Sequence, residues 1–428
     1  MTSRLRQLAS AALFLGGVSC SSPQATTWYR GNLHTHTLWS DGDQFPEVVL
    51  QWYKDQGYDF VSISDHNLLA DSERWLPLAG RPAQESALVE YQRLFGAEWV
   101  DTRRDSAGGV EVLLKKYQEY SNRLATPGFL VIQSEEITDR FDTRPLHLIG
   151  TNVAELVPPQ GGTSVREALQ RNVDAVRAQR QRTGRPMFAH VNHPNFGWAV
   201  TVEDLIALQN AQFVEVYNAH PIVRSEGDSL HPPVERLWDI LLAVRLSAGN
   251  SMMYGVAVDD AHNYGRYEPR PGGPYDSGPA SPGRGWVVVR AGQLSADSLV
   301  AAMERGDFYF SSGVSLDAIS ATAESLTIRI KAEPGVSYVT QFVGTRRGVD
   351  TTSSALPEVD RLPVSRRYSN DIGVVLAEVA GPSASYRFTG DELYVRARIR
   401  STKAKDNPIV AGETERAWTQ PVRPGGAR

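Results

Sequence analysis

The most informative segment of the sequence spans residues 32–42 and carries two histidines, His34 and His36, separated by one residue. In an extended strand, positions i and i+2 point to the same face, so a single metal ion could bind both imidazoles. Asp41 follows shortly afterwards, directly before a glycine at which the chain can turn. A carboxylate oxygen beside two imidazole nitrogens suits Zn, Mn or Fe better than Ca or Mg. A lone His-x-His pair is a weak signal, because surface strands often carry one by chance.

The positions of the other histidines strengthen the metal hypothesis. All nine histidines lie between residues 34 and 262, and most of them end an apolar run that is typical of a strand. Carboxylates accompany them, since the pair Glu135 and Glu136 ends one such run and Asp260 precedes His262 by two residues. Ligands at successive strand ends would converge on one mouth of an α/β barrel, where such barrels hold their chemistry.

The order of these motifs resembles the polymerase-and-histidinol-phosphatase (PHP) metallohydrolases. The order is His-x-His, Ser-Asp-Gly, Asp-His, Glu, His-Leu-x-Gly, His-Pro and Asp-x-His, and it runs from about residue 28 to residue 312. Within the family, the segments Asn192-His193-Pro194 and Glu215-Val-Tyr-Asn218 resemble the branch that includes carbaryl-hydrolase-like proteins. The resemblance implies a distorted (βα)7 barrel that binds two or three divalent ions.

The resemblance also implies roles for the acidic residues. Glu136 and Asp260 are the expected bridging carboxylates. Glu136 is preferred over Glu135 because the family's acid directly precedes Ile or Leu and then Ser or Thr, as Glu136 does here. Where Asp41 stands, some family members have His, and both residues can bind a metal.

The complete ligand set is too large for one tetrahedral ion and could fill two or three sites with bridging carboxylates. A divalent ion lowers the pKa of bound water from about 15.7 to near 7 in a favourable site, and two ions can share a hydroxide and stabilise the leaving oxygen. We therefore expect a hydrolase that uses two or three Mn, Fe or Zn ions. The candidate metal ligands are His34, His36, Asp41, His66, Glu136, His147, His193, Asp260 and His262.

Other polar residues near these motifs receive supporting roles. Asp260 could accept a proton while it holds a bridging metal, and His193 or His220 could protonate the leaving group. Arg144, Asn218 and His220 are candidate substrate contacts, although a surface ion pair is the commoner role for any one arginine. His190 is predicted to be structural. Asp65, Glu135 and Asp259 are predicted to orient the metal ligands through hydrogen bonds.

The expected substrate is a small phosphomonoester or phosphodiester. A carboxyl ester or carbamate is the nearest alternative, because the same hydroxide attacks carbonyl carbon. No Gly-x-Ser-x-Gly nucleophile motif occurs. An alternative of another class is a non-catalytic, metal-stabilised binding protein at the cell surface, although such a protein would have no chemical reason to keep all nine ligand positions. The net charge of −5 and the lack of a basic stripe indicate no nucleic-acid partner.

The pattern of the chain predicts an α/β fold of alternating strands and helices over residues 28–312. Residues 70–127 are longer than a crossover needs, so we expect an insertion there with helices at 85–95 and 110–124, acting as a lid or collar or as a structural flap. Beyond residue 313, apolar and polar residues alternate with a period of two, which predicts a small antiparallel β domain over 313–428 without catalytic residues.

The first twenty residues resemble a bacterial lipoprotein signal. Arg4 and Arg6 precede an apolar stretch that is too short to span a bilayer, and Cys20, the only cysteine, follows it directly. We expect lipidation of Cys20, a tether at 21–27 and an exported protein held at an outer or cytoplasmic membrane surface, with plain secretion to the periplasm or exterior as the alternative. A single cysteine excludes an internal disulfide.

Overall fold

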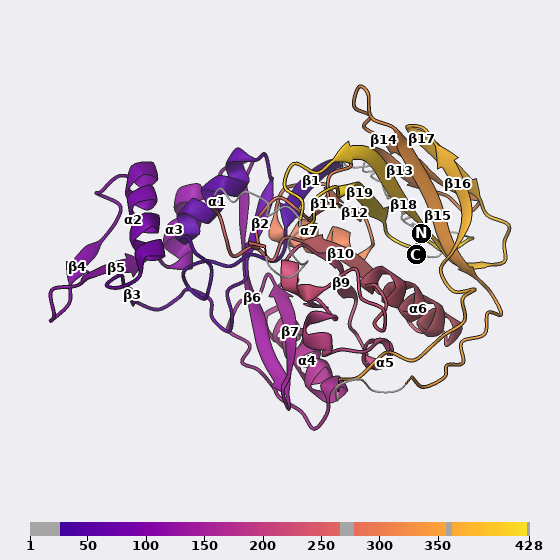
Figure 1. Ribbon diagram of the computed structural model, residues 1–428, viewed down its shortest axis with the longest axis horizontal. Helices are drawn as coiled ribbons and strands as arrows, with labels where there is room; N and C mark the ends of the chain where they lie inside the picture. The colour runs from indigo at the N-terminus through magenta and orange to yellow at the C-terminus, as the bar shows by residue number, and fades with distance from the viewer. Residues whose placement is uncertain (1–25, 266–277, 357–361, 426–428) are drawn as a thin grey trace, which may run out of the picture.

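A computed structural model describes residues 26–265, 278–356 and 362–425 (Figure 1). The predicted signal, Cys20 and most of the tether lie outside these residues, so their prediction stays untested. Within the described ranges, no helix has the length and apolar character needed to cross a membrane.

A single sheet of 13 strands forms the frame of the molecule. In hydrogen-bonded order its strands are β10 (Tyr254–Val258), β9 (Phe213–Asn218), β8 (Phe188–Val191), β7 (Arg144–Thr151), β6 (Leu130–Phe141), β2 (Phe60–Ile63), β1 (Thr27–Asn32), β11 (Trp286–Ala291), β12 (Phe308–Ser311), β19 (Thr414–Thr419), β18 (Glu392–Ala404), β15 (Tyr338–Arg346) and β16 (Val374–Ala380). The sheet curls so that β10, at one end of this order, lies against β11 and β12.

The helices that pack on the curled part of the sheet are α1 (Pro46–Asp55), α3 (Tyr117–Leu124), α4 (Val165–Thr183), α6 (Val234–Ser247) and α7 (Ala296–Glu304) (Figure 1). Helix α5 (Val202–Ala207) packs on α4 and α6, and α2 (Pro82–Phe95) contacts α1. Two short 3-10 helices are η1 (Phe196–Trp198) and η2 (Pro221–Val223). The two ends of α4 follow from its sequence, because the Ser164 side chain accepts a hydrogen bond from the Glu167 amide and Gly184 ends the helix in the left-handed conformation.

The fold is mixed α/β, as predicted, but the regular alternation of a (βα)7 barrel is not confirmed. Strands β1 and β2, β2 and β6, β8 and β9, and β9 and β10 pair in parallel. In contrast, β6 and β7 form an antiparallel hairpin, and β11 runs antiparallel to β1. The hairpin replaces one helical crossover, so strand and helix do not alternate throughout.

The segment 70–127 projects from the body of the molecule (Figure 1). It contains α2, α3 and a three-stranded antiparallel sheet of β3 (Arg74–Pro77), β5 (Val110–Leu114) and β4 (Thr102–Arg104). The predicted helix at 110–124 is therefore wrong in its first part, because Val110–Leu114 pairs with two strands and only Tyr117–Leu124 is helical. Val112 and Leu114 are buried on one face while their neighbours are less so, which is a strand period.

The strands after residue 313 are antiparallel, as the period-two pattern predicted. A second small sheet pairs β13 (Leu316–Ala321), β14 (Ser325–Ile330) and β17 (Ser383–Arg387). Strand β19 pairs with β12, so the large sheet continues from the N-terminal strands into the C-terminal ones. The division of the chain into domains at residue 313 stays a prediction.

A buried ion-pair network joins the C-terminal strands to α6. Arg396 of β18 is fully buried and donates two hydrogen bonds to the Asp239 carboxylate, at 2.9 and 2.6 Å. Its third nitrogen, Nη1, lies 2.9 Å from Glu235, and the Tyr394 hydroxyl also donates to Asp239. Removing one partner from such a network leaves an uncompensated buried charge.

We therefore predict that Arg396→Met lowers the free energy of unfolding by about 3–5 kcal/mol, because Asp239 and Glu235 lose their cation in a buried position. Urea unfolding measures the change. The matched control is Arg171→Met, which removes an exposed pair with Glu167 on α4 and should cost less than about 0.5 kcal/mol. Equal, small effects of the two substitutions would contradict a structural role for the network.

Candidate metal centre

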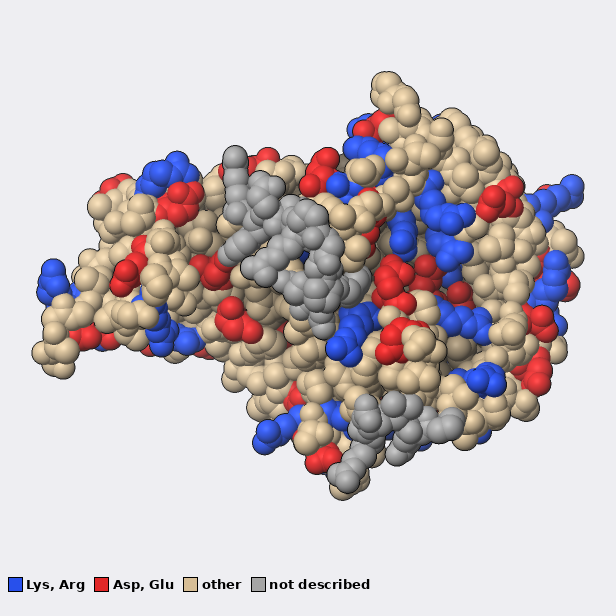
Figure 2. All heavy atoms as spheres, viewed as in Figure 1, with Lys and Arg blue, Asp and Glu red and all other residues tan. Residues whose placement is uncertain are grey.

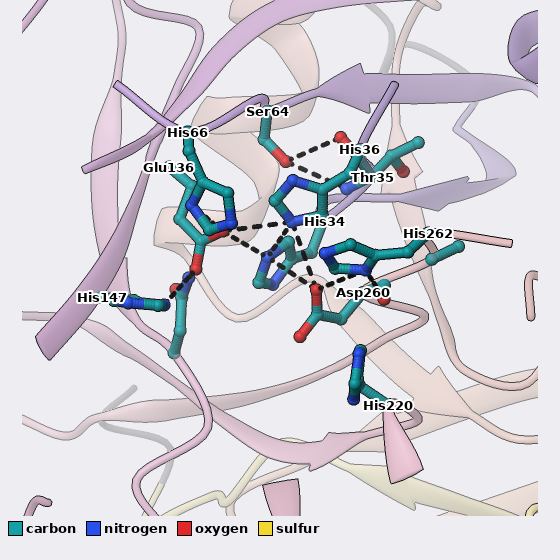
Figure 3. A network of polar contacts seen from close by, with 12 residues as sticks. His34, Thr35, His36, Ser64, His66, Glu136, His147, His220, Asp260 and His262 are labelled. Carbon is teal, nitrogen blue, oxygen red and sulfur yellow. Dashed lines mark hydrogen bonds and ion pairs between the residues drawn. The ribbon is translucent and has the colours of Figure 1, made fainter. Parts of the chain in front are cut away.

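The predicted metal ligands converge at one end of the curled sheet, where most of the strands that carry them finish (Figure 3). The parallel strands β1, β2, β8 and β10 deliver their ligands just after they end. The hairpin of β6 and β7 extends beyond this end of the sheet, so Glu136 and His147, which lie within the hairpin, reach the other ligands. The clustered side chains are His34, His36, Asp41, His66, Glu136, His147, His193, Asp260 and His262.

The Glu136 carboxylate lies at the centre of the cluster. Its Oε2 atom is 3.2 Å from Nε2 of His34 and 3.1 Å from Nε2 of His36. The same oxygen is 3.1 Å from Nδ1 of His66, and Oε1 is 2.9 Å from Nδ1 of His147. Glu136 is 1% exposed, so these four imidazoles surround a carboxylate that water does not reach.

Asp260 faces Glu136 across the two histidines of the opening motif. Its Oδ1 atom is 3.2 Å from Nε2 of both His34 and His36. Its backbone has a φ of 51°, in the left-handed region that non-glycine residues rarely adopt. Such a conformation persists where the surroundings over-determine it, which is common at functional sites.

Asp41 lies on the side of the cluster that faces solvent. Its carboxylate lies 3.5 Å from His36 and His66 and 3.4 Å from His262. It is 54% exposed, whereas Glu136 and Asp260 are almost fully buried. A substrate could therefore approach the cluster from the side of Asp41.

The donor atoms of the cluster fit divalent metal ions. Oε2 of Glu136 and Nδ1 of His147 are buried and have no hydrogen-bond partner, although each lies close to the other ligands. A buried carboxylate oxygen without a partner is costly, and a coordinated cation removes that cost. Among the described residues, five groups have ligand atoms within 4.8 Å of one another: His36, Asp41, His66 and His262; His34, His193 and Asp260; His34, His36 and Glu136; His66, Glu136 and His147; and His34, His190 and Glu215.

The protonation states of the cluster reflect its buried carboxylates. Burial alone would lower the pKa of His34, but Asp260, Glu136 and Glu215 outweigh it and raise that pKa well above its ordinary value. Burial alone would raise the pKa of Glu136, but the charges of His34, His66 and His147 hold it well below its usual range. The cluster thus stabilises carboxylates by positive charge, which is the role that a metal ion takes over when it binds.

Glu215 is a functional residue that the ligand prediction missed. This fully buried carboxylate of β9 accepts hydrogen bonds at 2.7 Å from Nδ1 of His34 and at 2.8 Å from the His193 amide. It also accepts one at 2.9 Å from Asn218, and His190 lies 3.2 Å away. Glu215 therefore fixes the His34 ring so that Nε2 points toward Glu136 and Asp260.

Two other predicted orienting carboxylates hold loops instead of imidazoles. Asp65 accepts hydrogen bonds from the backbone and side chain of both Thr37 and Ser40, and so shapes the turn between His36 and Asp41. Asp259 accepts hydrogen bonds from Tyr53 and from the amides of residues 283–285. Their effect on the metal ligands passes through the backbone.

Glu135 and Arg144 are not brought to the cluster. Glu135 points to the opposite face of β6 from Glu136 and accepts a hydrogen bond from the Val157 amide, because adjacent strand residues alternate in direction. Burial raises the pKa of Glu135 to about 8. The Arg144 guanidinium lies 5.2 Å from the Phe141 ring centroid and makes no described hydrogen bond or ion pair with a ligand.

His220 and Asn218 adjoin the cluster from β9. The Asn218 amide donates hydrogen bonds to Asp260 and Glu215, so it positions Asp260 and has fewer donors left for a substrate than predicted. The His220 ring lies 5.1 Å from the His262 ring, between centroids. Burial lowers the pKa of His220 to about 4, so its imidazole is neutral at pH 7.

No protein-family model matches the sequence, and no curated protein matches it. A solved structure of a two-domain protein from Bacteroides vulgatus, which contains a predicted PHP-like metal-dependent phosphoesterase, is similar at 15% identity and a TM-score of 0.40, over 94% of this chain and 98% of that chain.

Two shorter solved structures also resemble the chain. A candidate metal-dependent phosphoesterase from Bifidobacterium adolescentis has 13% identity and a TM-score of 0.29, over 58% of this chain and 92% of its own. An amidohydrolase from Chromobacterium violaceum, with bound sulfate and no metal, has 12% identity and a TM-score of 0.28, over 55% and 88%. These TM-scores are low, so the function of the chain rests on its own residues.

We predict that Glu136→Gln loses most of the metal that the purified protein binds, because the substitution removes the central negative charge among four imidazoles. Metal content after removal of free ions is measured by inductively coupled plasma mass spectrometry. Glu135→Gln is the matched control, one residue away on the other face of β6, and should bind as much metal as the wild type. Equal metal content in the two variants would contradict the central place of Glu136.

Proposed function

We propose that the chain is a metal-dependent hydrolase of ester bonds and that its substrate is a small phosphomonoester or phosphodiester. The observation that carries the proposal is the convergence of two buried carboxylates, Glu136 and Asp260, on the same pair of imidazoles, His34 and His36. A carboxylate shared in this way is suited to bridge ions, as two-metal hydrolases require.

The proposed cofactors are two or three divalent ions, with Mn, Fe or Zn as the candidates. When bound in such a site, divalent ions lower the pKa of coordinated water and withdraw charge from the oxygens of an ester. The mixture of imidazole and carboxylate donors supports these metals over Ca or Mg.

The charge balance of the site favours an anionic substrate. The three carboxylates that face the ligand atoms are Asp41, Glu136 and Asp260, and two or three divalent ions would exceed their combined charge. A further carboxylate, Glu215, is buried and is satisfied by hydrogen-bond donors on the far side of His34. A net positive centre attracts a phosphate ester more strongly than a neutral carboxyl ester.

Residues beside the metal ligands hold them in position and can contact a substrate. Glu215 and Asn218 hold His34 and Asp260 in place, and Asp65 fixes the turn that carries Asp41. Nδ1 of His220 accepts a hydrogen bond from the Ile222 amide, so the neutral ring carries its proton on Nε2. His220 can therefore donate a hydrogen bond to a substrate oxygen near the cluster, and His193 is the alternative donor.

A carboxyl-ester or carbamate bond is the second candidate substrate, because the same site would polarise a carbonyl oxygen. The finer assignment to the PHP family, its seven-unit barrel and its carbaryl-hydrolase-like branch rests on the motif order.

We also propose export with a lipid anchor at Cys20, which rests on the sequence of the first twenty residues. Mass spectrometry of the membrane fraction would reveal a diacylated Cys20, and an unprocessed N-terminus would contradict the anchor.

We predict that the Mn-loaded protein hydrolyses a chromogenic phosphomonoester or phosphodiester, that chelation abolishes turnover, and that Asp260→Asn lowers kcat more than about 100-fold. Loss of a hydrogen-bond partner of a metal ligand costs up to about 100-fold, and loss of the ligand itself should cost more. Asn tolerates the left-handed backbone of position 260, so the fold should survive. Product absorbance measures the rate.

The control is Asp174→Asn, an exposed carboxylate on α4, which should keep full activity. Turnover of a carboxyl ester alone would favour the second candidate substrate. Bound metal without turnover of any phosphate or carboxyl ester would contradict the proposal and favour a metal-stabilised binding protein.

A further inference from the structure

A cavity of about 730 Å³ lies between the N-terminal strands and the C-terminal β strands. One wall comes from β1, α1, β11 and β12, and the other comes from β18, β19 and the residues that follow β14. None of the candidate metal ligands lines it. On β11 the lining residues Trp286 and Val288 alternate with Val287 and Val289, which pack in the core on the other face of the sheet. The cavity is therefore separate from the metal cluster.

Aromatic side chains form one wall of this cavity. Trp28, Trp52, Trp286 and Tyr309 all line it, and Trp28 and Trp52 are partly exposed. The Trp28 and Tyr309 rings meet edge to face, with 5.3 Å between centroids, so their positions are fixed by packing. The partly exposed indoles offer apolar surface to a ligand inside a cavity of the size that small-molecule sites have.

Arg30 contributes a cationic group to the wall of the cavity. Its guanidinium carbon lies 3.8 Å from the Trp286 ring centroid and 4.0 Å from the Tyr58 ring centroid. These two rings are nearly perpendicular, with an interplanar angle of 76° and 6.2 Å between centroids, so they hold the guanidinium in place without covering both of its faces. Nε of Arg30 is buried, so it is not a contact for a ligand in the cavity.

The charged residues around the cavity balance one another. Four cationic and five acidic side chains line it. Several of them pair, as Lys403 does with Glu333 at 2.9 Å and with Glu415 at 3.2 Å. A lining of mixed sign creates no strong field, so it selects neither an anion such as phosphate nor a polycation. It does present many donors and acceptors to a neutral ligand that is rich in hydroxyl groups.

We propose that this cavity binds a neutral saccharide, at a site distinct from the metal centre. The apolar C–H face of a sugar ring stacks on a partly exposed indole, and its hydroxyl groups pair with the carboxylates and lysines of the lining. Neutral sugars combine both properties in one molecule. The cavity therefore serves recognition of a glycan or of the sugar part of a larger molecule.

The test is isothermal titration of the full-length protein with glucose, N-acetylglucosamine, maltose and cellobiose. We expect saturable binding of at least one sugar. Trp52→Ala should weaken that binding about tenfold, which corresponds to the loss of one aromatic contact. The matched control is Trp75→Ala, which removes a partly exposed indole in the projecting segment and should bind as the wild type does.

Thermal unfolding shows whether the Trp52→Ala protein is folded. Where it is not, Trp52→Phe keeps an aromatic side chain in the same packing and should weaken binding several-fold. Saturable binding of no sugar, or equal affinity of the wild type and the folded Trp52 variant, would overturn the proposal. Because the titration does not depend on turnover, its outcome is separate from that of the proposed hydrolase activity.

Discussion

The structure of the site depends on the burial of two carboxylates, Glu136 and Asp260, among imidazoles at one end of a curled sheet. A carboxylate that leaves water without a compensating charge loses several kcal/mol of solvation. The imidazole nitrogens of His34 and His36 lie 3.1–3.2 Å from both acids, but a neutral His34 ring uses its only proton on Glu215 and has none left for Glu136 or Asp260. A divalent cation bound through the same atoms would supply the compensating charge.

Other buried carboxylates carry out the supporting work and do not enter the cluster. Glu215 orients His34 and holds the His193 backbone, Asp65 shapes the turn before Asp41, and Asp259 anchors residues 283–285 behind Asp260. Each is saturated with hydrogen-bond donors, which is how proteins retain charge inside a core. On the face shown in Figure 2, Lys and Arg mix with Asp and Glu, and no comparable separation of charges is visible there.

Much of the ligand cluster could be predicted from sequence because its signal is local. A histidine or acid that ends an apolar run marks a strand end, and strand ends of an α/β sheet meet. Glu215 was missed as a ligand support because it stands inside an apolar run, although an acid at an inward strand position is itself a signal. The direction of Glu135, away from the cluster, follows from strand alternation with Glu136, although Glu135 was predicted to orient the metal ligands.

The parts that failed depend on long-range pairing. Residues 110–114 contain Val and Leu that suit either a helix or a strand, and only their pairing with β3 and β4 decides for the strand. The β6–β7 hairpin likewise breaks the expected alternation through contacts that no short window contains. The cavity behind β11 needs side chains from both ends of the chain, so no single motif predicts it.

Anomalous diffraction from crystals of the metal-loaded protein, collected at the absorption edges of Mn, Fe and Zn, would locate the bound ions and identify them. We expect two or three anomalous peaks, at least one of them between the Glu136 and Asp260 carboxylates and the His34 and His36 rings. Crystals from metal-containing solution that show no peak beside Glu136 and Asp260 would contradict the claim that these buried carboxylates form a metal centre.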